Sequence, residues 1–473
     1  MKTMKKLLAV ILAMTLTMVM GICASATAPG GGDGDGTNAA PKGSITVTNA
    51  IVGETYTLYK VFDATVANGR ADEGTGISYT STWFTKEIAA TCEYFDLDDS
   101  GNITIMPAGK KDSGELSDDA ITWLKDQKTS YFTQIGQPVE AASTTVKWED
   151  LDPGYYYIDT TTGSFVTVDS ITPNVNVEDK NSLPSHDKKQ ATAADGTFGD
   201  DLLELNIGDT VYYQTEIKIG KGSDKAITLT DTMTSGLDLN QSAITVKKGS
   251  ETVPASNYDL TPSEHGFTLV LKADYVQKLS NTDVITVAYS AVINEKAAID
   301  SATGNSNKAK LEYSEQEATD TVYVATYDFQ LFKTDGSAEH TYLPGATFKL
   351  YDALTEGNLI PVGKDDTGYY LDSTKDVEIE VTSADGVNVR GLKPGTYYLE
   401  EIHAPSGYNK LTERKPVTIT SKQDKPHEVY VENHAGAELP NTGGRGTTLL
   451  YAIGAALVIG AAVLLIARRR TEQ

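Results

Sequence analysis

The sequence predicts a mainly β protein made of three tandem immunoglobulin-like β-sandwich domains, with a helical insertion in the first. Residues 45–47 and 55–59 alternate apolar or aromatic side chains with threonines, and similar runs, broken by Gly, Asn and Asp, continue along the chain. Alternation with a period of two is typical of half-buried strands, and many short strands separated by turns are typical of β-sandwiches. The roughly 400 residues between the two terminal segments fit three domains of about 100–150 residues each.

The N-terminus has the pattern of a secretory signal peptide over residues 1–28. Three lysines within the first six residues precede an apolar run at 7–22, and small residues that suit cleavage follow. Residues 29–42 are dominated by glycine and predict a flexible leader. Cleavage of the signal would leave Cys92 as the one cysteine of the mature chain. No intramolecular disulfide is then available, so stability outside the cell must come from another source.

The C-terminus, residues 437–473, predicts a sorting signal. Residues 447–467 carry no charge and are long enough, as a helix, to cross roughly 30 Å of hydrocarbon. Three arginines follow at 468–470 and favour a cytoplasmic end. The pentapeptide before the span resembles the LPxTG signal of Gram-positive sortase substrates; its residues are Leu439, Pro440, Asn441, Thr442 and Gly443. This resemblance implies cleavage between Thr442 and Gly443, secretion, cell-wall anchoring, and only transient membrane insertion.

Charge and composition disfavour several other functions. The precursor has 40 basic and 65 acidic residues, a net charge of -25, which disfavours nucleic acid as a partner. The histidines show no metal-ligand spacing, and no catalytic set of residues stands out, so we predict no enzyme activity, no cofactor and no metal. Residues 96–101 begin like a calcium loop, but the twelfth position is Pro107 where a bidentate Glu is needed. Whether the first domain binds a metal stays open.

Internal similarity sets the domain boundaries. Residues 53–59 resemble 345–351, and residues 151–158 resemble 392–399. The first and third domains are therefore predicted to share one fold. The expected domains are 43–180, 181–326 and 327–436. A helix capped by Ser117 is expected as an insertion in the first domain, because two aspartates fill its first turn.

The third domain carries the most specific motifs. Residues 329–335, 345–348 and 398–408 together resemble the Cna B-type domain of Gram-positive surface proteins and pilins. That family often closes an internal isopeptide bond, and the resemblance implies Lys333 as the amine, Glu401 as the acid and Asn433 as the carboxamide. Lys333 also shares a strand face with two apolar side chains, so we expect it to be buried. Burial favours the neutral, nucleophilic amine and a protonated carboxyl group.

The second domain resembles the pilin middle domain that forms a Lys–Asn bond. The resemblance rests on residues 186–189, 207–213, 227–233 and 305–309. It implies Lys188 as the amine, Asp231 as the acid and Asn307 as the carboxamide. Lys189 and Asn305 remain alternatives. We prefer Asn307 because it shares a strand face with apolar residues.

The first domain lacks the corresponding chemistry. The internal similarity places Asn49 where the third domain has Lys333, and Thr160 where it has Glu401. Lys60 is a poor substitute because it lies on the second strand. We therefore predict two isopeptide bonds, neither of them in the first domain.

Lys180 ends the first domain within residues 175–181, which resemble the pilin motif whose lysine accepts the next subunit. Nearly the whole chain is similar to Spa- and Fim-type backbone subunits of sortase-assembled pili. The resemblance implies as partners a pilin-type sortase, further copies of the chain, minor pilins, and peptidoglycan through a housekeeping sortase. The alternative is a cell-wall-anchored adhesin or minor pilin that is not polymerised.

Overall fold

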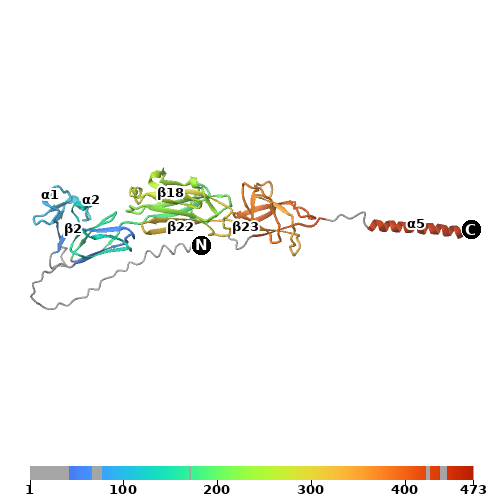
Figure 1. The fold of residues 1–473 in the computed structure, drawn as a ribbon, viewed down its shortest axis with the longest axis horizontal. Helices are drawn as coiled ribbons and strands as arrows, with labels where there is room; N and C mark the ends of the chain where they lie inside the picture. The colour runs from blue at the N-terminus through green and yellow to red at the C-terminus, as the bar shows by residue number, and fades with distance from the viewer. Residues whose placement is uncertain (1–41, 67–76, 170–171, 422–426, 437–444, 472–473) are drawn as a thin grey trace, which may run out of the picture. The chain divides into compact units, whose positions relative to one another are not determined.

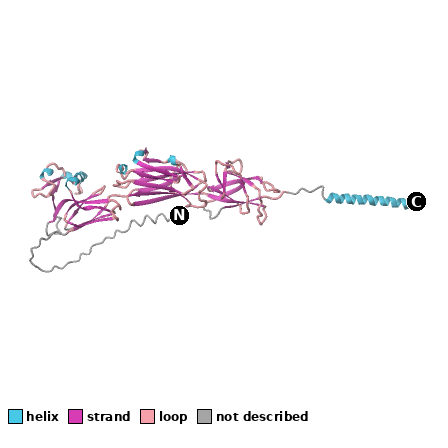
Figure 2. Ribbon diagram, in the orientation of Figure 1, coloured by secondary structure: helices cyan, strands magenta, loops and turns pink. Residues whose placement is uncertain are grey.

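The computed structural model describes residues 42–66, 77–169, 172–421, 427–436 and 445–471. These residues form β-sandwiches in chain order, with short helices beside the first and a long helix near the C-terminus (Figures 1 and 2). The predicted fold class is confirmed. The signal peptide, all but the last residue of the leader, and the pentapeptide 439–443 lie outside the described residues.

The first sandwich has two main sheets, one in the order β10-β1-β7 and the other in the order β3-β2-β8-β9 with β6 paired to β2. Its strands are β1 Gly43–Thr48, β2 Thr55–Val66, β3 Ile77–Thr80, β6 Thr133–Glu140, β7 Thr145–Leu151, β8 Gly154–Asp159, β9 Ser164–Val168 and β10 Asn174–Glu178.

An insertion between β3 and β6 holds α1 Lys86–Ala89, the hairpin of β4 Phe95–Leu97 and β5 Ile103–Ile105, the 3-10 helix η1 Pro107–Gly109, α2 Asp118–Asp126 and α3 Lys128–Tyr131. The predicted cap is present, since the Ser117 hydroxyl accepts a hydrogen bond of 3.2 Å from the Ala120 amide. Leu124 on α2 is fully buried in an aromatic cluster with Phe84 and Phe95.

The second sandwich packs a sheet of order β11-β13-β20-β16-β17, with β15 paired to β20, against a sheet of order β12-β22-β21-β14-β19-β18. Its strands are β11 Ser185–Ala191, β12 Leu203–Glu204, β13 Thr210–Lys218, β14 Ile227–Met233, β15 Leu237–Leu239, β16 Thr245–Lys248, β17 Glu251–Thr252, β18 Tyr258–Ser263, β19 Gly266–Leu271, β20 Val284–Ile293, β21 Asn305–Tyr313 and β22 Gln316–Ala325. Short helices η2 Gln241–Ala243, η3 Ala255–Asn257 and α4 Ala273–Val276 lie in the connections.

The third sandwich has sheets of order β26-β27-β29-β23-β32 and β25-β24-β30-β31, with β28 paired to β24. Its strands are β23 Tyr327–Thr334, β24 Thr347–Tyr351, β25 Leu359–Ile360, β26 Val362–Asp365, β27 Gly368–Leu371, β28 Ile379–Glu380, β29 Val387–Leu392, β30 Gly395–His403, β31 Lys415–Ile419 and β32 His427–Glu432.

The first and third sandwiches share strand pairing as well as sequence. In both, the first strand lies between two partners, the last strand in parallel and an earlier strand antiparallel: β1 with β10 and β7, and β23 with β32 and β29. A buried tyrosine repeats too, since the Tyr156 hydroxyl donates to the Asp152 carbonyl and the Tyr397 hydroxyl donates to the Lys393 carbonyl. The internal similarity seen in the sequence therefore reflects a common topology.

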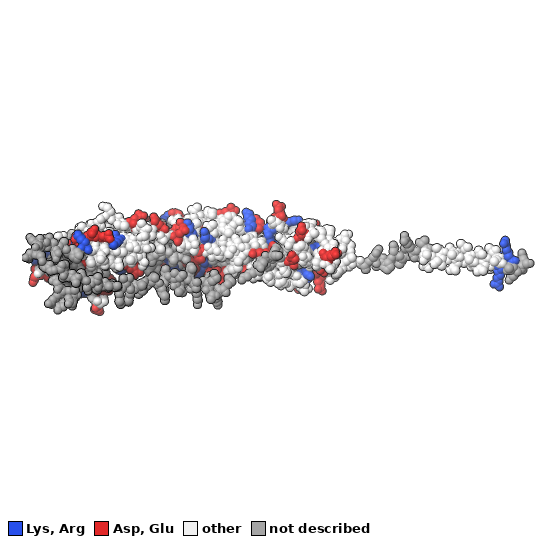
Figure 3. Space-filling model, turned by 90° about the horizontal axis from the view of Figure 1, so that it is seen from below, with Lys and Arg blue, Asp and Glu red and all other residues white. Residues whose placement is uncertain are grey.

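The last helix, α5 Arg445–Thr471, is long and apolar enough over Leu449–Arg470 to cross a membrane. Its described side chains up to Ile466 are exposed and uncharged, and arginines gather at its C-terminal end (Figure 3). This matches the predicted span at residues 447–467. Exposed Leu, Ile and Val over such a length suit a hydrocarbon environment.

Candidate functional site

The second sandwich buries the predicted triad between its two sheets. Lys188 comes from β11 at the edge of one sheet, while Asp231 of β14 and Asn307 of β21 come from neighbouring strands of the other. All three side chains are at most 3% exposed. A lysine is almost never fully buried unless its charge is paired, so we expect Lys188 to have a polar partner between the sheets.

Hydrogen bonds connect this triad through a tyrosine that the sequence reasoning missed. The Lys188 ammonium nitrogen lies 2.6 Å from Asp231 Oδ2 and also donates to the Tyr289 hydroxyl. The same hydroxyl donates to Asp231 Oδ2 and accepts from Asn307 Nδ2 at 3.3 Å. Asp231 Oδ1 and Asn307 Oδ1 are buried without a hydrogen-bond partner. Each of these two oxygens can therefore still accept a hydrogen bond.

The electrostatics of this triad favour a nucleophilic lysine. Burial lowers the pKa of Lys188, and the charge of Asp231 only partly opposes this. The rings of Tyr213 and Tyr289 oppose this in part, because a cation 5.2 and 5.0 Å from their centroids is attracted to the ring faces. Burial thus favours the neutral form of the Lys188 amine, which is the nucleophilic form.

The structure separates the alternatives that the sequence left open. Lys189 points to the other face of β11, where its half-exposed side chain pairs with Asp187 and Glu216. Asn305 is buried, but its side chain bonds the backbone of Ala298 at both ends, with distances of 2.7 and 2.8 Å. Lys188 and Asn307, and not Lys189 or Asn305, thus lie in the buried hydrogen-bond network around Tyr289.

The third sandwich assembles its predicted triad differently. Lys333 of β23, Glu401 of β30 and Asn433 just after β32 are each 1% exposed. Asn433 Nδ2 lies 2.9 and 3.1 Å from the two Glu401 oxygens, and the Leu411 amide also donates to Glu401. The Lys333 nitrogen donates to the carbonyls of Thr334 and Val431 at 3.1 and 3.0 Å. Here the acid contacts the carboxamide directly.

Strand pairing explains why Lys333 and Asn433 lie on adjacent segments of one sheet. β23 and β32 are parallel neighbours, with Lys333 opposite Val431 and Thr334 opposite Glu432. Asn433 continues this line one residue beyond the strand, and its amide donates to the Thr334 carbonyl at 3.0 Å. Burial lowers the pKa of Lys333 to about 8, so roughly a tenth of the amine is neutral at pH 7.

The first sandwich retains one equivalent of this triad. By strand register, Asn49 takes the place of Lys333, Thr160 that of Glu401, and Asn181 that of Asn433. Asn49 is exposed and bonds Glu178. The amine and the acid are thus replaced, as predicted, while the carboxamide remains. Lys60 lies on β2, as expected, and pairs with Asp63 at 2.6 Å.

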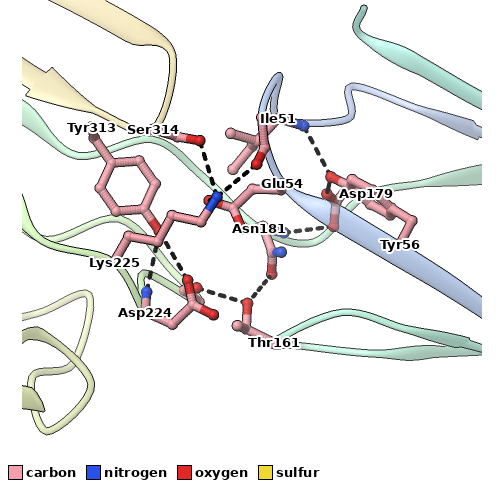
Figure 4. Close-up of polar contacts among 12 residues, drawn as sticks. Ile51, Glu54, Tyr56, Thr161, Asp179, Asn181, Asp224, Lys225, Tyr313 and Ser314 are labelled. Atoms are coloured by element: carbon pink, nitrogen blue, oxygen red, sulfur yellow. Dashed lines mark hydrogen bonds and ion pairs between the residues drawn. The ribbon is translucent and has the colours of Figure 1, made fainter. Parts of the chain in front are cut away.

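Lys180 is an exposed side chain between two anchored neighbours. Asp179 accepts a hydrogen bond from the Tyr56 hydroxyl, and its other oxygen accepts from the Asn181 amide at 3.1 Å. Thr161 donates to the Asn181 side chain at 3.2 Å and to the Gly222 carbonyl at 2.7 Å (Figure 4). The backbone on both sides of Lys180 is thus held while its amine faces solvent.

A polar cleft of about 390 Å³ lies beside this segment. Its lining includes Glu54, Thr161, Asn181 and Lys225. Lys225 bonds the Gly53 carbonyl at 2.6 Å and lies 3.1 Å from Glu54 (Figure 4). These contacts connect the turn before β2 to the loop before β14, next to Asn181.

The possible calcium loop of the first domain is a hairpin turn. Asp98 Oδ1 accepts from the amides of Ser100 and Asn102, both at 2.8 Å, so this carboxylate closes the turn between β4 and β5. Within the described ranges, no group of three or more His, Cys, Asp or Glu side chains could hold a metal ion.

Comparison with known families identifies three segments. Residues 327–435 match the SpaA prealbumin-like fold domain, and residues 207–317 match the Cna-B-like domain of Gram-positive pilin backbone subunit 2. Residues 431–472 match the LPXTG cell wall anchor motif. The chain thus has the domains of a Gram-positive backbone pilin with a cell-wall anchor, and the predicted resemblance and surface location are confirmed.

The chain is also similar to individual known proteins. The chain is 24% identical over 401 residues to the trypsin-resistant surface T6 protein of Streptococcus pyogenes serotype M6. The matched region covers 62% of this chain and 70% of that protein. Among solved structures, the T6 backbone pilin of serotype M6 S. pyogenes matches with a TM-score of 0.49 and 18% identity, covering 81% of each chain. The group B streptococcus pilus 2b backbone protein matches with a TM-score of 0.42 and 27% identity, covering 51% of this chain and 98% of that one.

Proposed function

Because the chain carries backbone-pilin domains and a cell-wall anchor motif, we propose that it is the shaft-forming subunit of a covalently polymerised surface pilus. In this proposal a pilin-type sortase cleaves between Thr442 and Gly443 and holds the Thr442 carbonyl as an acyl-enzyme. The Lys180 amine of another copy attacks that carbonyl, so an amide joins the two subunits. A housekeeping sortase attaches the finished polymer to peptidoglycan, and minor pilins join the same polymer.

The observation that carries this proposal is the setting of Lys180. A lysine that must reach an acyl-enzyme needs an exposed amine, and its backbone must be held so that the amine is presented in one place. The hydrogen bonds of Asp179 and Asn181 supply the second condition, and exposure supplies the first. The boundaries 43–180, 181–326 and 327–436 belong to the same proposal, with Lys180 closing the first domain.

Two intramolecular bonds stabilise the subunit in this proposal, Lys188–Asn307 and Lys333–Asn433. In each, the neutral lysine attacks the Asn side-chain carbonyl carbon, a protonated Asp231 or Glu401 hydrogen-bonds the carbonyl oxygen, and ammonia leaves. Each bond joins the first strand of its sandwich to a strand late in the sequence. Tension entering one end of a sandwich can then cross it without separating the strands.

The polymerisation test is a covalent ladder on denaturing gels, with the pilin and its sortase expressed together. Replacing Lys180→Ala is expected to abolish the ladder. Lys221→Ala is the matched control, because Lys221 is also exposed and lies just beyond the Thr161 and Gly222 contact. A ladder that persists in the Lys180→Ala variant would remove this lysine from the shaft role.

The alternative, a non-polymerised cell-wall adhesin or minor pilin, has a different outcome in the same experiment. It predicts that the unmodified protein forms no ladder of its own with any sortase. It also predicts that a polymer built from another subunit contains at most one copy of this protein. Counting copies of the chain per polymer separates these two functions.

A further inference from the structure

The Tyr289 hydroxyl contacts all three members of the triad in the second sandwich. It accepts a hydrogen bond from the Lys188 nitrogen, accepts another from Asn307 Nδ2 at 3.3 Å, and donates its own proton to Asp231 Oδ2. Both lone pairs and the single proton of the phenol are therefore used within the reacting group.

The tyrosine ring is held in this position. It comes from β20, is 3% exposed, stacks on Tyr213 with 5.4 Å between ring centroids, and meets the edge of Phe267 at 4.9 Å. A side chain packed on both sides loses little further freedom when the reaction begins.

The two triads show why such a bridge is useful. In the third sandwich, Glu401 bonds Asn433 directly through both carboxyl oxygens. In the second sandwich, Asp231 bonds Lys188, and hydrogen bonds connect Asp231 to Asn307 through the Tyr289 hydroxyl. The phenol therefore lies between the attacking nitrogen and the nitrogen that must leave.

We propose that Tyr289 is a catalytic residue of the Lys188–Asn307 cross-linking reaction, in which its hydroxyl carries a proton from the attacking nitrogen to the leaving nitrogen. This inference rests on the proposed function, because it assigns a role within that reaction.

The reaction replaces the C–Nδ2 bond of Asn307 with a C–Nζ bond and releases ammonia. Lys188 first gives one proton to Asp231, which leaves a neutral amine and a carboxylic acid. The amine attacks the Asn307 carbonyl carbon, forming the C–Nζ bond, a positively charged nitrogen and an oxyanion that Asp231 stabilises with its proton. Tyr289 accepts a proton from that nitrogen and gives its own to Nδ2. The C–Nδ2 bond then breaks, ammonia leaves, the carbonyl re-forms, and ammonia finally takes the proton of Asp231.

A buried phenol suits this role because it remains neutral. Burial, together with the negative charge of Asp231, raises the pKa of Tyr289 well above its usual value. Tyr289 can therefore exchange one proton for another without holding a charge. Positioned proton transfer of this kind typically contributes about 10²–10⁴-fold to a rate.

The test follows cross-linking in the full-length chain after cell-free synthesis, with samples quenched in denaturant at timed intervals. Intact mass counts the ammonia molecules lost, and peptide mapping assigns each loss to the second or third sandwich. We expect Tyr289→Phe to slow the Lys188–Asn307 bond by about 10²-fold or more. The Lys333–Asn433 bond of the same molecules should form at the wild-type rate.

The matched control is Tyr313→Phe. Tyr313 lies on β21 with Asn307, and its buried hydroxyl accepts from the Asp224 amide at 3.1 Å, away from the triad. This variant should form both bonds at wild-type rates. A Tyr289→Phe variant that cross-links as fast as the wild type would overturn the role of Tyr289 and leave the proposed function intact. A wild-type chain without the Lys188–Asn307 bond would instead overturn that part of the proposed function, and this inference with it.

A second measurement is needed if the Tyr289→Phe variant does not fold, which the absence of a cooperative unfolding transition would show. The wild-type rate is measured in mixtures of H₂O and D₂O. A relay moves two protons in one step. A plot of the cross-linking rate against the D₂O fraction should therefore be curved. A straight line, indicating one moving proton, would overturn the proposal.

Discussion

The third sandwich offers the sharpest stability prediction, through Glu401→Gln. Glutamine has almost the same shape, and its carbonyl oxygen can still accept from the Leu411 amide, which now bonds Glu401 at 2.8 Å. Glutamine cannot supply the carboxyl proton that the reaction needs. The variant should therefore fold but lack the Lys333–Asn433 bond, so its intact mass should show one ammonia lost instead of two.

The magnitude follows from the size of the loop that the bond closes. Lys333 and Asn433 are separated by about 100 residues, for which loop-closure entropy gives about 4.7 kcal/mol, by analogy with a disulfide. In a domain of roughly 100 residues, each kcal/mol shifts the melting temperature by about 4–8 °C. We therefore expect the calorimetric transition of the third sandwich to fall by roughly 19–38 °C.

Glu400→Gln is the matched control, because Glu400 is the preceding residue on β30 and its partly exposed side chain pairs with Arg414 at 2.9 Å. Exposed ion pairs contribute about 0–1 kcal/mol, so this change should leave the bond intact and move the transition by only a few degrees. Two results would refute the reasoning: a Glu401→Gln chain that still loses two ammonia molecules, or one that lacks the bond and melts within about 5 °C of the wild type.

Three further outcomes are expected. Lys188→Ala should reduce the ammonia deficit of the purified chain from two to one, whereas Lys189→Ala should leave it at two; the reverse would reassign the lysine. Burial and the neighbouring Asp300 raise the pKa of Asp328 to about 7. The folded state then keeps a proton that the unfolded state loses, so its contribution to stability should be full below pH ~4 and lost as the pH rises through 7. Denaturant titrations should show this slope in the wild type and a flatter one in Asp328→Asn. Finally, Ser117→Ala should lower the free energy of unfolding of the first sandwich by about 1 kcal/mol, because α2 loses its cap. A melting curve identical to that of the wild type would mean that the cap is dispensable.

Local patterns in the sequence were sufficient for the features that depend on near neighbours in the chain. Strand alternation predicted the fold class, the serine and aspartate pattern predicted α2, and the uncharged run predicted α5. The burial of Lys333 followed from the two apolar residues that share its strand face. Each of these is a periodic or adjacent arrangement, which one stretch of chain specifies by itself.

The tertiary structure decided what depends on contacts between distant strands. Asn305 and Asn307 both lie on the buried face of β21, and only the neighbouring loop shows that Asn305 is used by the backbone of Ala298. From the sequence pattern, Tyr289 is predicted only to be a buried strand residue. Its position between Lys188 and Asn307 arises because β20 of one sheet faces β14 and β21 of the other. Sequence alone therefore determined the destination and the strands, whereas the packing of two sheets determined which side chains meet.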